Sequence, residues 1–100
     1  MGQTEWVQTL RKILNDEFFK ESISSTSVEY LGESIYLTPE GEAPIIVSFK
    51  FQAWSLGHST YFNSVIHVPK ESFNKNPEES LIAIGQSAVK NLLEQTKNIR

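Results

Sequence analysis

Residues 45–54 have the sequence IIVSFKFQAW, and the alternation within this stretch decides the fold. Its odd positions, from Ile45 to Ala53, are all apolar. A repeat of two residues is typical of a β-strand that buries one face and exposes the other. The even positions include Ser48, Lys50, Gln52 and Trp54. The stretch therefore predicts a strand whose odd side chains pack under another layer while the even ones face outward.

A second strand is expected directly after this one. Residues 60–68 place Phe62, Ile66 and Val68 on one face. Pro69 ends the pattern because it has no backbone N–H to give to a sheet. The intervening residues read SLGHS, which is typical of a turn. The two strands therefore form a hairpin.

The stretch before the central strand, residues 28–37, is strand-like but irregular. The turn that follows it reads TPEG at residues 38–41, where proline and glycine suit the corners. A regular strand would bury Glu29 and Glu33 on the same face as apolar side chains. We therefore expect a β-bulge near Gly32. With that bulge the inward residues are Val28, Tyr30, Ile35 and Leu37, and the outward ones are Glu29, Ser34 and Tyr36.

A helix is expected at each end of the chain. Apolar residues recur at helical spacing from Thr4, a suitable N-cap, to Phe19, and the hydroxyl-rich residues 22–27 then form a loop. The second helix begins after Asn76 as N-cap, with Pro77 at the first helical position. The residues between the last strand and this helix are expected to be a polar connection that contains a single apolar side chain, that of Phe73.

These elements predict one α+β domain over residues 1–100, in the order α-β-β-β-α. The chain has 100 residues, of which 39% are hydrophobic and 21% charged, so it can bury one thin core. Short connections favour a three-stranded antiparallel meander. Both helices are expected on one face of the sheet, and Gly85 and Ala88 allow the second helix to approach it closely. The other face is then open.

The open face is the candidate functional surface. The expected hairpin register pairs Trp54 with Tyr61. The same register places opposite one another Gln52 and Asn63, Lys50 and Val65, and Ser48 and His67. A shift of two residues would keep the same side chains on each face. Tyr36 is expected to add a third aromatic side chain from the first strand.

Such a face has the composition of a protein-contact surface, because Trp and Tyr offer large area with little side-chain entropy to lose. The expected contact residues are Trp54, Tyr61, Lys50, Gln52, Asn63, His67 and Tyr36. The alternative is that Trp54 and Tyr61 only stack across the hairpin and stabilise it, which is worth ~0.2–1 kcal/mol.

The residues that usually carry catalysis or bind metals are scarce. The chain has no cysteine, Asp16 is its only aspartate, and its two histidines are His58, in a turn, and His67, in a strand. A histidine needs a positioned partner to act as a base or ligand, and none lies nearby in the sequence. The acidic side chains around the first hairpin match no metal-binding loop and are expected to be solvated; they are Glu29, Glu33, Glu40 and Glu42. We therefore expect no catalytic site, no cofactor and no metal.

The charge of the chain separates two classes of binding protein. Its net charge of −3 favours a protein partner, or a second copy of the chain, over nucleic acid or an anionic membrane. The order of elements resembles that of the double-stranded RNA-binding domain, which makes nucleic-acid binding the alternative. Such domains present a basic cluster where this chain has Glu78 and Glu79. No apolar run is long enough to span a membrane, so a soluble, cytoplasmic domain is expected.

Overall fold

An antiparallel sheet of three strands, in the order β1-β2-β3, forms the centre of the molecule. The structure is a computed structural model that describes residues 2–18, 23–41, 43–55 and 60–98. Its elements are α1 (Gln3–Phe18), β1 (Ile23–Ile35), β2 (Ile45–Ser55), β3 (Thr60–Pro69), α2 (Lys70–Lys75) and α3 (Pro77–Asn98). The predicted α+β class, the α-β-β-β-α order and the antiparallel meander are confirmed, with the short helix α2 inserted before α3.

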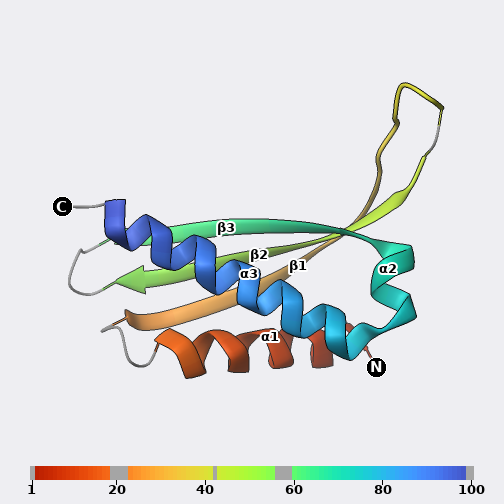
Figure 1. Cartoon of the computed structure of the whole chain (residues 1–100). Coiled ribbons are helices and arrows are strands. Elements are labelled where there is room, and N and C mark those ends of the chain that lie inside the picture. The colour runs from red at the N-terminus through yellow and green to blue at the C-terminus, as the bar shows by residue number, and fades with distance from the viewer. Residues whose placement is uncertain (1, 19–22, 42, 56–59, 99–100) are drawn as a thin grey trace.

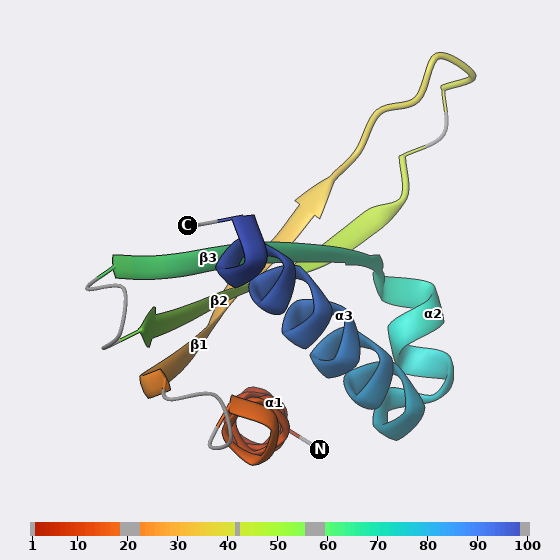
Figure 2. The same ribbon diagram turned by 60° about the vertical axis from the view of Figure 1, so that its left-hand side comes forward.

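Both long helices cover the same face of the sheet, as predicted. Figures 1 and 2 show α1 and α3 on one side of the three strands. Their apolar stripes meet the odd positions of β2 in one core. The fully buried side chains include Leu10, Leu14, Val47, Phe49, Phe51, Phe62, Phe73, Leu81 and Leu92. Burying a side chain of this size contributes about 1.5–3 kcal/mol, so the core holds the helices on this face.

The register of the second hairpin is the predicted one. Trp54 pairs with Tyr61, and the pairing continues without interruption to Ile46 and Pro69. The bulge in β1 is also confirmed, because the register shifts between Tyr30 and Gly32. Gly32 has a φ of 101°, a left-handed conformation that glycine adopts without strain.

Beyond the bulge, the predicted inward orientation of Ile35 and Leu37 is wrong. Their side chains are 68% and 76% exposed. The first hairpin extends past the end of the helix layer, so neither face of it has a core to pack against. Figures 1 and 2 show this extension as a long arm that projects from the body of the molecule. We call residues 35–45 the hairpin arm.

Backbone hydrogen bonds order the arm up to its turn. The Tyr36 N–H donates to the Pro44 carbonyl at 3.0 Å, just beyond the last paired residues of β1 and β2. The Gly41 N–H closes the turn on the Thr38 carbonyl at 3.0 Å. Gly41 takes a φ of 83° there, which is the glycine role that the TPEG sequence predicts.

Three local predictions need correction. The stretch predicted to be a loop is largely strand, because β1 already starts at Ile23 and pairs with the far end of β2. The first helix begins at Gln3, so Thr4 lies inside it rather than at its N-cap. The connection around Phe73 is the helix α2, and the Phe73 ring stacks edge-on against Trp6 with centroids 4.8 Å apart.

The start of α3 follows the sequence closely. The Asn76 side chain accepts a hydrogen bond from the Glu79 N–H at 3.4 Å and donates one to the Glu79 carboxylate at 2.7 Å, and Pro77 is the first helical residue. Gly85 allows a close approach to Ile13 of α1 rather than to the sheet. The predictions for Phe19, Glu42 and His58 fall outside the described residues.

Candidate protein-contact surface

The open sheet face is the side of the three strands that α1 and α3 do not cover. Trp54 of β2 and Tyr61 of β3 lie at one end of it, with ring centroids 4.7 Å apart and ring planes at 53°. Alternation puts both on the face opposite Phe51 and Phe62, which are buried. Tyr61 is 60% exposed, while Trp54 is half-buried. The pair thus presents a tilted aromatic surface to solvent at the chain's second hairpin.

Polar side chains continue this face across all three strands. The Ser27 hydroxyl donates to Gln52 Oε1 at 3.4 Å, and Gln52 Nε2 donates to Asn63 Oδ1 at 2.8 Å. The Gln52 amide thus bonds to a side chain of each neighbouring strand. The predicted neighbours on the face are therefore held together by specific hydrogen bonds and form an ordered polar surface beside the aromatic pair.

The outer edge of β3 is tied to α3 at the same position. Gln95 Nε2 donates to the Asn63 carbonyl at 2.6 Å, and Gln95 Oε1 accepts from the Asn63 N–H at 3.2 Å. These two contacts occupy backbone groups that another strand would otherwise bind. Sequence reasoning missed Gln95, because nothing in a helical pattern shows that a side chain will bond to a strand edge.

His67 has a partner across the hairpin, at the position that the predicted register gives it. Its Nδ1 shares a 2.6 Å hydrogen bond with the Ser48 hydroxyl, across the predicted pairing of the two strands. Ser48 is only 6% exposed, so this hydroxyl is not open to a substrate. The bond joins β2 to β3 and leaves His67 at the surface of the open face.

Lys50 occupies the middle of the open face, next to one acidic and one aliphatic side chain. The register places Lys50 between Glu29 of β1 and Val65 of β3. A cation with an acidic side chain directly opposite contributes little net positive potential. Val65 is 44% exposed beside it. The middle of the face is therefore close to neutral, with one exposed aliphatic side chain.

Tyr36 does not join this surface. It lies in the hairpin arm, beyond the end of β1, and is 63% exposed. Trp54 pairs with Ser25 at the opposite end of β1. At about 3.3 Å per residue, the two aromatic side chains are on the order of 30 Å apart along the strand. The expected third aromatic residue of the open face is thus part of a separate surface.

The carboxylates of the first hairpin that the structure describes are those of Glu29, Glu33 and Glu40. Among the described residues, no group of three or more potential ligands comes together. Glu33, expected to be solvated, forms an ion pair with Lys70 at 2.8 Å. The hydrogen bond and the charge of Glu33 hold the pKa of Lys70 above its ordinary value. This pair connects the base of the arm to the start of α2.

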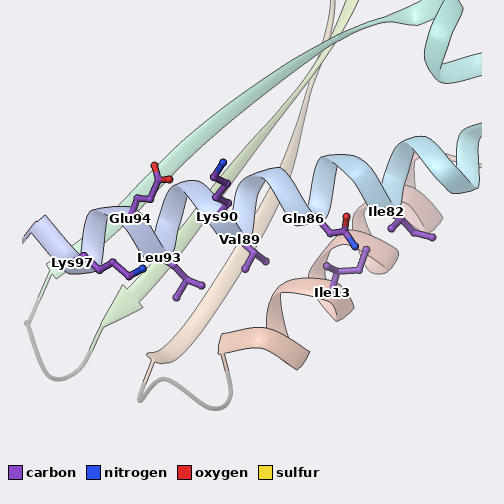
Figure 3. A pocket seen from close by; sticks show the side chains of 8 residues that line it. All are labelled: Ile13, Ile82, Gln86, Val89, Lys90, Leu93, Glu94 and Lys97. Carbon is purple, nitrogen blue, oxygen red and sulfur yellow. The ribbon is translucent and has the colours of Figure 1, made fainter.

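A groove between α1 and α3 lies on the opposite side of the molecule from the open face. It has a volume of about 470 Å³ and a largely apolar floor. Figure 3 shows Val89 and Leu93 pointing from α3 toward α1, and Ile13 reaching back from α1. The sequence carries one signal for it, because Ile82 and Leu93 are apolar but fall outside the inner stripe of α3.

Comparisons with protein families, with curated proteins and with solved structures give no match for this chain. Within the part of the chain that the structure describes, no helix is both long and apolar enough to cross a membrane.

Proposed function

We propose that this chain is a small non-enzymatic protein-interaction module of the cytoplasm, and that its open sheet face is the contact surface. The observation that carries the proposal is the uncovered face itself, which presents the Trp54–Tyr61 pair next to an ordered polar ladder. Protein contact surfaces combine aromatic anchors with hydrogen-bonding groups in this way. The partner is another protein or a second copy of the chain.

The alternative of nucleic-acid binding has weaker support. Phosphate contacts supply most non-specific affinity for nucleic acid, and they need several unpaired cations on one surface. On the open face Lys50 lies opposite Glu29, and the first turn of α3 carries Glu78 and Glu79. We therefore expect no mobility shift with duplex RNA or DNA at micromolar protein and physiological salt. A shift that weakens steeply with added salt would support the alternative.

A photo-crosslinking experiment tests the proposed surface directly. A benzophenone amino acid replaces Tyr61 in one variant and the exposed Glu71 of α2 in a control, and both are expressed in the source cells. We expect a discrete protein adduct from position 61 only. Adding Trp54→Ala to the same chain should reduce that adduct, because the aromatic neighbour of the probe is removed while the fold is kept.

The outcome identifies the class of partner as well as the surface. An adduct that contains a second copy of the chain shows self-association through the open face. An adduct that nuclease destroys, no adduct at position 61, or equal labelling from position 71 each contradict the proposal.

A further inference from the structure

The hairpin arm carries apolar side chains for which the folded chain provides no core. Ile35, Tyr36 and Leu37 are 68%, 63% and 76% exposed, and they follow one another in the sequence. A two-stranded ribbon is at best marginally stable on its own, and monomeric proteins rarely expose contiguous apolar patches. The backbone bonds at Tyr36 and Gly41 nevertheless hold the arm in an ordered shape. The arm is therefore an ordered projection whose apolar side chains face solvent and not the core of the same chain.

The groove between α1 and α3 is a concave surface that is apolar, like the exposed side chains of the arm. Its apolar lining comes from Ile13, Ile82, Val89 and Leu93. Ile82 is 50% exposed, so part of this lining faces solvent. A volume of about 470 Å³ lies within the usual range for pockets that enclose a ligand of several large groups. The groove can thus take up more than one bulky side chain.

The charges of the two surfaces are complementary. Among its described residues the arm carries the acidic side chain of Glu40 and no basic side chain. The groove is bordered by Lys90, Lys97 and Glu94, which leaves one net positive charge. In Figure 3 Lys97 extends alongside Leu93, at the apolar lining. An acidic arm tip with an apolar stem therefore suits this groove both by charge and by polarity.

The arm of one molecule cannot reach its own groove. In both ribbon views the arm leaves the sheet on the side away from α1 and α3 (Figures 1 and 2). Both halves of the complementary pair nevertheless belong to one chain. We propose that the hairpin arm of one copy of this chain docks into the α1–α3 groove of a second copy. The contact is heterologous, because two different surfaces meet, and it leaves the open sheet face uncovered.

Disulfide mapping tests this contact, and the natural absence of cysteine makes the chain a clean background. Protein carrying Leu37→Cys is mixed with protein carrying Ile82→Cys under mild oxidation. We expect a mixed disulfide to form about tenfold faster than with the control variant Val65→Cys, whose site on the open face has a similar exposure of 44%. Equal rates with the two partners, or no mixed disulfide, overturn the proposal.

Sedimentation equilibrium provides the second test, in solution and without cross-linking. We expect the wild-type chain to associate with rising concentration, and Leu37→Asp to weaken that association at least about tenfold, as for a central interface residue. Lys97→Glu should weaken it as well, and adding Glu40→Lys should restore part of the loss. Circular dichroism should show an unchanged fold for Leu37→Asp, because that side chain is 76% exposed.

The control variant for the sedimentation experiment changes a residue of the open face. Val65→Asp should leave the association unchanged. A chain that stays monomeric to millimolar concentration, or association that survives Leu37→Asp, overturns the arm–groove contact. Association that is lost with Val65→Asp but kept with Leu37→Asp also overturns it, while supporting self-association through the open face. The two proposals therefore fail on different variants.

Discussion

Replacing Gly85 with alanine should destabilise the domain, although the same change stabilises an ordinary helix. A β-carbon built at Gly85 lies 2.8 Å from Ile13 Cγ2, 2.9 Å from Cδ1 and 3.2 Å from Cβ. Carbon atoms in contact normally lie about 3.5–4.0 Å apart, so the side chain of Ile13 must move. Isoleucine has essentially one favoured χ1 rotamer in a helix, which limits that movement.

Two opposing free-energy contributions determine how far Gly85→Ala changes the stability of the domain. Gly→Ala inside a helix contributes about 1 kcal/mol in favour of folding. Overpacking a close contact costs about 1–3 kcal/mol. Because Ile13 is only half-buried and can yield in part, the cost should lie in the middle of that range. We expect Gly85→Ala to lower the free energy of unfolding by about 1 kcal/mol, which corresponds to ~4–8 °C in Tm for a domain of this size.

A double-mutant cycle with Ile13→Ala isolates the contact. Removing Cγ2 and Cδ1 leaves only the contact at 3.2 Å, so Gly85→Ala should then stabilise the Ile13→Ala protein by about 1 kcal/mol. The coupling between the two sites should be about 2 kcal/mol, measured by urea unfolding of the four proteins. If Gly85→Ala stabilises the wild-type and the Ile13→Ala proteins equally, the two helices do not pack closely at Gly85.

Three further predictions concern the sheet and its surroundings. Trp54→Ala should lower the free energy of unfolding, measured by urea titration, by about 1 kcal/mol. It should weaken binding to the partner by about 2 kcal/mol or more. A large loss of stability with unchanged affinity would instead place Trp54 in the core. Gln95→Ala should lower the free energy of unfolding by about 1 kcal/mol. It should also increase aggregation on heating, because the backbone of Asn63 can then bind another strand; unchanged light scattering on heating would contradict this. The free energy of unfolding should fall as the pH rises above about 10. Burial raises the pKa of Tyr30 above its ordinary 10.0, and the Glu33 carboxylate raises the pKa of Lys70 above 10.5. Each group therefore stabilises the fold while it is protonated, and this contribution is lost as the pH rises through its folded-state pKa. Urea midpoints measured from pH 8 to above pH 10 should show this fall, and Tyr30→Phe should reduce it; a constant midpoint would contradict the reasoning.

The strands with strict alternation were predictable in type and, to within a shift of two residues, in register. The alternating apolar side chains of the two strands, such as Phe49, Phe51 and Phe62, must share one face. Only shifts of two residues preserve that arrangement. The bulge was predictable for the same reason, because Glu29 and Glu33 cannot both be buried. Alternation is informative here because the penalty for a wrong face applies at every residue of the strand.

Predictions from local side-chain chemistry were wrong where pairing with a distant strand determines the structure. Residues 23–27 are rich in hydroxyl groups that favour a loop, yet β2 extends to Ser55 and supplies partners for them along a whole strand edge. The outward position of Leu37 has a related cause. Its place in the alternation predicts burial, but the helix layer ends before the arm does. A sequence pattern shows which side chains share a face and does not show how far the covering layer extends.

The positions of the surfaces determine how they can act together. The helices α1 and α3 lie on one side of the sheet and leave the other side uncovered (Figures 1 and 2). The groove is lined by residues of these two helices, so it lies on the side away from the open face. Contact through the arm and groove therefore leaves the open sheet face of each copy uncovered. An assembly of this kind presents several identical faces, which raises its avidity for a multivalent partner without any new contact. Leu37→Asp should then reduce binding to an immobilised, densely spaced partner far more than binding to the same partner free in solution, while Trp54→Ala should reduce both.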